Sequence, residues 1–165
     1  MKYQTNPSHG KFINAWGCNI CSIMCKVEIT SARYGKPFKF SNSDVGGVYL
    51  EAMRRGIVGP ETYTEDGEPL DGCVVFNGKA LFNLCAEMFN LPVYCESMVQ
   101  APASYVPTTG EEEILELRRP DYKGSHFVCG DGKGGIQFDP IEGGSKMARF
   151  GYVASKRIYR IVRRK

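Results

Sequence analysis

The chain has 165 residues, of which 42% are hydrophobic and 24% charged, and it carries a formal net charge of +3. A chain of this length supports one domain that buries roughly two-thirds of its unfolded surface, and no run approaches the ~18 apolar residues of a membrane span. Seven cysteines without an apolar signal segment near the start argue against a disulfide framework. We therefore expect a single domain over residues 1–165, with reduced thiols, in the cytoplasm.

Segments with helical spacing of apolar residues occupy the first half of the chain. The first begins at Cys18 and can end at Gly35, and the second covers residues 45–53. The third follows a predicted N-cap at Asn77 and stops before a proline. An acidic, turn-rich loop over residues 59–72 separates the second helix from the third.

The second half consists of short segments that are mostly rich in β-branched or aromatic residues and are separated by glycine and proline. The expected strands are residues 93–99, 112–119, 125–131, 135–140, 148–153 and 157–162. Helices followed by strands predict an α+β fold, with N-terminal helices packed on a C-terminal antiparallel sheet of five or six strands.

The chain has two histidines, and only one of them lies in a strand pattern. His9 belongs to a turn-like N-terminal stretch, and we interpret it as exposed or locally hydrogen-bonded. His126 opens the run HFVC, which a glycine-rich turn separates from GIQFDP. If Gly132 and Lys133 form a two-residue hairpin loop, His126 faces Asp139 across the two strands.

This hairpin register also sorts the side chains between the two faces of the sheet. It places Phe127, Cys129, Ile136 and Phe138 on an apolar core face, and His126, Val128, Gln137 and Asp139 on the other. A carboxylate beside a histidine fixes the ring tautomer and stabilises the imidazolium, so the pair forms a base with its orienting group. A structural hydrogen bond between the two is the alternative, and Asp131, at the turn, is a more distant candidate for the orienting group.

The first predicted helix carries the candidate nucleophile. Cys21 and Cys25 fall in or at the border of its apolar stripe and are expected to pack in the core. Cys18 falls just outside the stripe, in the first turn, where unpaired N–H groups and the helix dipole stabilise a thiolate. We predict that Cys18 is the nucleophile and that its backbone N–H can donate to a developing oxyanion.

The order Cys18, His126, Asp139, with the cysteine opening the first long helix and the other two on an antiparallel sheet, resembles the papain-like cysteine peptidases. WGCNICSIM is similar to the cysteine box of the double-glycine leader peptidases, and HFVCGDGKGGIQFDP is similar to their histidine box and following Asp-Pro. The chain also resembles small phage-encoded papain-like proteins. The resemblance implies a papain-like fold and a thiol protease that acts on a peptide or protein and needs no cofactor or metal.

The sequence departs from the family at the oxyanion position. Papain-like peptidases usually have a glutamine six residues before the nucleophile, where this chain has Phe12. Asn14 has the right amide chemistry at a different spacing and is our candidate oxyanion donor, while Gln4 is farther away. Asn19 and Ile20 replace a Gly-Pro pair that often follows the nucleophile. These departures leave open a catalytically weak or inactive fold that acts as a protein-binding module or inhibitor.

Two further readings of the same residues stay open. The spacings Cys18-x₂-Cys21 and His126-x₂-Cys129 could spell a zinc site, but strand alternation separates the second pair and CNIC has helical character. Cysteine, histidine and aspartate chemistry also serves amidases, deamidases and acyl transferases, because the attacking group can be water or an amine. The sequence does not select the acyl donor.

Charge clusters bear on the partners. Six of the last ten residues are basic, which is typical of nucleic-acid contacts or of a solvated edge strand. No aromatic platform accompanies them, so we expect an edge strand, no nucleic-acid or membrane partner, and a peptide or protein substrate. The acidic residues between Glu61 and Asp71, and the run Glu111–Glu113, either border the cleft and favour basic partners or form solvated loops. The oligomeric state is not predicted.

Overall fold

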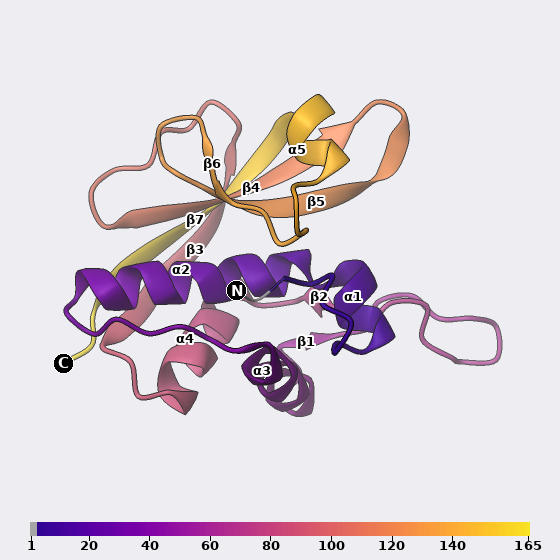
Figure 1. Ribbon diagram of the computed structural model, residues 1–165, viewed down its shortest axis with the longest axis horizontal. Helices are drawn as coiled ribbons and strands as arrows, with labels where there is room; N and C mark the ends of the chain where they lie inside the picture. The colour runs from indigo at the N-terminus through magenta and orange to yellow at the C-terminus, as the bar shows by residue number, and fades with distance from the viewer. Residues whose placement is uncertain (1–2) are drawn as a thin grey trace.

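The computed structural model describes residues 3–165 and separates into a helical part and a sheet (Figure 1). The helices are α1 (Lys11–Trp16), α2 (Cys18–Arg33), α3 (Asn42–Arg54), α4 (Gly78–Met88) and α5 (Lys146–Phe150). The strands are β1 (Val58–Gly59), β2 (Val74–Val75), β3 (Val93–Pro102), β4 (Glu111–Arg119), β5 (Tyr122–Gly130), β6 (Ile136–Phe138) and β7 (Tyr152–Arg163).

The main sheet has five strands in the order β3-β7-β4-β5-β6, and every neighbouring pair is antiparallel. Strands β1 and β2 form a separate two-stranded hairpin. The prediction of a mixed fold, with helices first and an antiparallel sheet of five or six strands after them, is confirmed in this form.

Helix α2 is the central element, lying between the sheet on one side and α3 and α4 on the other (Figure 1). Ile20, Ile23, Met24 and Val27 are completely buried on it, and each such side chain stabilises the fold by about 1.5–3 kcal/mol. The helix ends where Gly35 adopts a φ of +86°, a conformation that glycine reaches without strain. Its predicted start and end are confirmed.

Local capping explains where α3 and α4 begin. Ser41 and Asp44 form a reciprocal capping box at α3. The side chain of Asn77 accepts a hydrogen bond of 2.9 Å from the backbone N–H of Ala80, which confirms the predicted N-cap of α4.

The expected strand over residues 148–153 is wrong at its first half. Residues 146–150 form the short helix α5, because the side chain of Ser145 caps it by accepting from the N–H of Ala148. Gly151 then makes the turn into β7, where an added Cβ would overlap the carbonyl oxygen of Met147. Helix α1 was not predicted; it has only six residues, too few for a clear apolar period.

The basic segment at the C-terminus is not an edge strand, because β7 lies between β3 and β4. Its Lys156 is buried and donates to Glu113 at 2.8 Å, while Arg157 lies 3.3 Å from Glu116. Lys26 of α2 donates to Glu112 at 3.0 Å. The acidic run that could have been a solvated loop is therefore a buried strand whose charges are matched by basic side chains on its neighbours.

The hairpin of β5 and β6 has a different register from the predicted one. Cys129 pairs with Phe138, and Gly130 with Ile136 across a bulge. The turn spans residues 131–135, closed by the N–H of Asp131 donating to the carbonyl of Gly135. With this longer turn and bulge, Ile136 is 41% exposed and Gln137 accepts from the buried Lys26. The predicted core position of Ile136 is thus wrong and Phe138 is only half-buried, stacked on Tyr3, whereas Cys129 is buried as expected.

Within residues 3–165, no helix combines the length and the apolar character needed to cross a membrane.

Candidate active site

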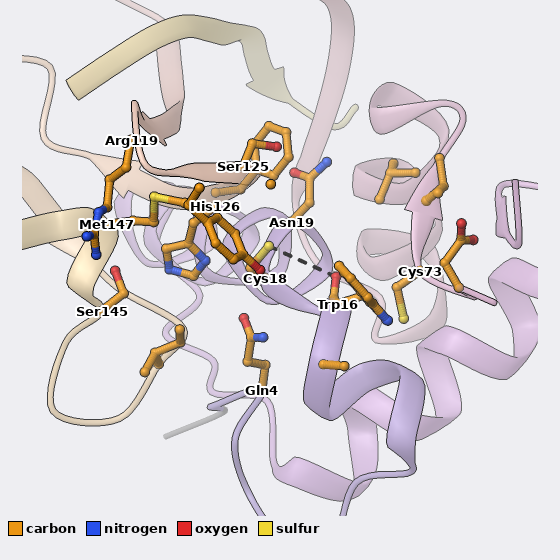
Figure 2. A pocket seen from close by; sticks show the side chains of 18 of the residues that line it. Gln4, Trp16, Cys18, Asn19, Cys73, Arg119, Ser125, His126, Ser145 and Met147 are labelled. Atoms are coloured by element: carbon orange, nitrogen blue, oxygen red, sulfur yellow. Dashed lines mark hydrogen bonds between the residues drawn. The ribbon is translucent and has the colours of Figure 1, made fainter. Parts of the chain in front are cut away.

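A cavity of about 1100 Å³ lies where the start of α2, the β1–β2 hairpin, strand β5 and the segment before α5 meet. Cys18 and His126 both line it, from opposite elements (Figure 2). Glu61 and Asp71 of the acidic loop also line this cavity, which is the first of the two alternatives for the acidic segments. The acidic run of β4 does not line it.

The position of Cys18 follows from a tight junction between two helices. Gly17 alone separates α1 from α2, and its N–H donates to the carbonyl of Ile13 at 2.8 Å. A Cβ at Gly17 would lie 2.5 Å from that backbone oxygen, so a larger residue does not fit. Cys18 is consequently the first residue of α2, where the N–H groups have no acceptor within the helix. Cys21 is completely buried in the main core and Cys25 is nearly so, as predicted.

Two hydrogen bonds hold this helix against the strand of His126. The hydroxyl of Ser22 donates to the carbonyl of Phe127 at 3.1 Å, and the thiol of Cys129 donates to the carbonyl of Ser22 at 3.2 Å. Because Ser22 lies one turn after Cys18 and Phe127 follows His126, these bonds fix the distance between the two candidate residues. Cys129 thus serves the packing of α2 on β5.

His126 is buried, with 6% of its surface exposed, and its Nε2 lies 2.7 Å from Oδ1 of Asp139. The other ring nitrogen, Nδ1, is left for the cavity, where the imidazole lies beside Cys18 (Figure 2). The structure therefore brings together Cys18, His126 and Asp139, although Asp139 follows the end of β6 and is not a ladder partner of His126.

Asp139 accepts hydrogen bonds on both oxygens. Besides His126, Oδ1 accepts from the N–H of Ile141 at 3.0 Å, and Oδ2 accepts from the N–H and hydroxyl of Ser145 at 2.9 and 2.7 Å. Burial alone would raise the pKa of this carboxyl, but these bonds outweigh it and lower the pKa to about 2. Asp139 is thus an anion at any ordinary pH. Asp131, the other candidate orienting group, instead accepts from N–H groups of its own turn.

The electrostatics of His126 favour its charged form. Burial would lower the pKa of the imidazole, but the hydrogen bonds to Asp139 and Cys18 outweigh this effect and raise the pKa to about 9. A protonated imidazole is therefore held between the carboxylate of Asp139 and the side chain of Cys18.

The candidate oxyanion donor Asn14 is not at the cavity. Its side chain is exposed and donates weakly to the carbonyl of Asn6 at 3.4 Å. Gln4 takes the place instead: it is 4% exposed, lines the cavity and points toward Cys18 and His126 (Figure 2). Its Nε2 donates to the carbonyl of Asn14 at 3.2 Å, and its Oε1 has no hydrogen-bond partner among the described residues.

The backbone ties Gln4 to the same turn that holds Asp139, since its N–H donates to the carbonyl of Pro140 at 2.9 Å. An amide nitrogen has two hydrogens, and Asn14 takes one of them, so the second can serve a ligand in the cavity. Spacing along the chain could not reveal this residue, because α1 and its turn lie between Gln4 and Cys18.

The alternative zinc ligands are not gathered at one place. Cys21 is in the main core and the thiol of Cys129 donates to Ser22, on the face of β5 away from His126. In residues 3–165, no three His, Cys, Asp or Glu side chains are arranged to hold a metal ion. His9, in the turn before α1, does not line the cavity.

Comparison with known proteins gave no match: no family model, no curated protein and no solved structure matches this chain.

Proposed function

We propose that this chain is a papain-like cysteine hydrolase, a peptidase or isopeptidase that cleaves an amide bond in a cytoplasmic protein or peptide. The observation that supports the proposal most is that His126, which Asp139 holds at 2.7 Å, lies beside Cys18 on the wall of one cavity.

The proposed reaction proceeds by acyl transfer. The Cys18 thiolate attacks the amide carbon, and the carbonyl oxygen becomes an oxyanion. The imidazolium of His126 then protonates the leaving amine, and the C–N bond breaks to give a thioester on Cys18. His126, now neutral, takes a proton from water, whose hydroxide attacks the thioester and releases the acid, restoring the thiolate and imidazolium.

Two donors are available for the oxyanion: the backbone N–H of Cys18 and the second hydrogen of the Gln4 amide. The departure at Phe12, which favoured a non-catalytic binding protein, loses weight because Gln4 supplies an amide from another position. Phe12 packs instead on the β1–β2 connection, within reach of a Cβ placed on Gly72.

Thiol reactivity at low pH tests the proposal. Brief alkylation with iodoacetamide near pH 6 should modify Cys18, because an unperturbed thiol with a pKa of about 8.5 is almost wholly protonated there. His126→Ala should abolish this reaction. Cys73 is the matched control, since it lines the same cavity but burial raises the pKa of its thiol to about 12. Modification of Cys73, Cys21 or Cys25 before Cys18 would refute the assignment of the nucleophile.

Hydrolysis is the second readout. The wild-type protein should cleave amide bonds in a peptide library generated from cell protein, and Cys18→Ala should cleave none of them. Cleavage that survives in Cys18→Ala would show that another group carries the reaction.

A further inference from the structure

The two ends of the cavity carry opposite charge. We call the connection of β1 to β2, residues 60–73, the acidic wall, because it contains five acidic and no basic residues (Glu61, Glu65, Asp66, Glu68, Asp71). Glu61 and Asp71 line the cavity directly, together with Leu70 and Cys73. Both oxygens of Asp71 accept from the backbone of residues 61 and 62, so its charge is held in place at the cavity.

The opposite end is formed by the β4–β5 turn, residues 118–123, and by residues 142–149 around α5, which we call the basic wall. It holds five basic and two acidic residues, and the cavity is lined here by Arg119, Tyr122, Lys146 and Met147. Arg118 is paired with Glu116 and Arg119 with Asp121. Neither Lys146 nor Glu61 has an oppositely charged group within 4.0 Å among residues 3–165, although Lys146 lies near enough to Asp121 to help lower the pKa of that carboxyl.

The chemistry of the site determines which wall faces the amine side of the cleaved bond and which faces the acyl side. His126 must lie over the leaving amine in order to protonate it, so the amine side of the substrate extends past His126. That is the side of Arg119, Ser145 and Met147, whereas Trp16 and Cys73 lie beyond Cys18 on the side of the acyl group (Figure 2).

We infer that the substrate is a charge-segregated peptide, with basic residues on the acyl side of the cleaved bond and acidic residues on the amine side. This inference rests on the proposed function for its direction. The residues next to the bond are uncharged and apolar on the acyl side, because the half-exposed Trp16 and Leu70 line the cavity there. The buried amide of Gln4, with its unpartnered Oε1, supplies a backbone contact between the two walls.

The test uses two synthetic peptides of the same composition, blocked at both termini to remove the terminal charges. One has three basic residues, a centre of leucine and alanine, and three acidic residues; the other has the reverse order. Binding to the Cys18→Ala protein is measured by fluorescence anisotropy. The basic-first peptide should bind at least about fivefold more tightly at low salt, and the preference should shrink in about 0.5 M salt.

Charge reversal locates the effect. Glu61→Lys and Lys146→Glu should each reduce the preference about two- to fivefold, which is the range expected for single exposed charges. Lys133→Glu is the matched control, because it makes the same change on the β5–β6 turn, outside the cavity, and should leave the ratio unchanged. Equal affinities, a reversed preference, or no binding of either peptide up to about 1 mM would overturn the inference.

The inference about charge order and the proposed hydrolase function can fail independently of each other. If the wild-type protein cleaves peptides through Cys18 but the two affinities are equal, only the charge inference fails. If Cys18 shows no reactivity and no hydrolysis occurs, the hydrolase proposal fails, and the ratio of affinities still decides whether the walls select charge order.

Discussion

Two regions of this molecule bury ionisable side chains, and they differ in how their chains of contacts end. On the β4–β7 strand pair, Glu113 and Lys156 lie 2.8 Å apart, and their remaining polar contacts go to the backbone of Gly132 and Tyr105. At the cavity, Asp139 is equally well bonded, but its partner His126 lines open space together with the buried Cys18. Buried charge by itself therefore indicates packing, and the thiol on the cavity wall is what motivates the proposed chemistry.

The largest effect that would test this difference is expected from His126→Ala. Removing the proposed general acid and base should lower hydrolysis at least about 10³-fold, since the members of such a triad act as a unit. The measurement is kcat/KM on a peptide that the wild-type protein cleaves, with circular dichroism to show that the fold is retained. A loss below tenfold in a folded variant would place His126 and Asp139 in a structural pair.

Glu113→Gln is the matching change in the other region, and we expect the opposite division of effects. The variant leaves Lys156 buried without its counter-charge, so the free energy of unfolding should fall by about 3–5 kcal/mol. Activity per folded molecule should stay within about twofold, because Glu113 does not line the cavity. Urea denaturation and active-site titration measure the two quantities. A loss of activity without a loss of stability would contradict the assignment of Glu113 and Lys156 to packing alone.

Gln4 allows a sharper test within the active site. Gln4→Ala should lower kcat about 10²–10³-fold if its amide donates to the oxyanion. Asn14→Ala is the control, since it removes an exposed amide of the same chemistry that does not reach the cavity, and its kcat should be unchanged. The reverse result would restore Asn14, the candidate that its amide chemistry indicated in the sequence.

Apolar periodicity and caps predicted α2, α3 and α4, because those signals are local. The same pattern placed Cys18 at the first turn of α2, where the structure has it. The neighbourhood of His126 and Asp139 was also expected, but for a partly wrong reason: the turn is longer than two residues, and Asp139 reaches the ring from beyond β6 rather than across the ladder. Residues near the open end of a short hairpin stay close in several registers. The predicted proximity was therefore right although the predicted register was wrong.

What could not be predicted depends on contacts between distant segments. The order of strands put β7 inside the sheet, and only the complementary charge of β4 and β7 could have indicated it. The place of Gln4 at the cavity was not predicted, because its distance to Cys18 depends on how α1 turns the chain back. The short helix leaves little periodic signal in the sequence.

The smallest effect concerns pH, and it follows from the pKa of His126, which is raised to about 9 from the ordinary 6.5. Hydrolysis needs the protonated ring, so kcat/KM should fall as the pH rises through about 9. The free energy of unfolding changes with pH in the same direction: the contribution of the charged ring is fully present below pH 6.5 and is lost as the pH rises through about 9.

Asp139→Asn removes a hydrogen bond that raises this pKa. The alkaline fall of kcat/KM and the alkaline loss of stability should therefore both move to lower pH, and the maximal rate should be lower. Ser145→Ala keeps the carboxylate of Asp139 and removes one of its hydrogen bonds, so both alkaline falls should stay near their wild-type pH. If Asp139→Asn leaves the alkaline limb in place, the group that titrates there is not His126, and the pairing would have no part in the reaction.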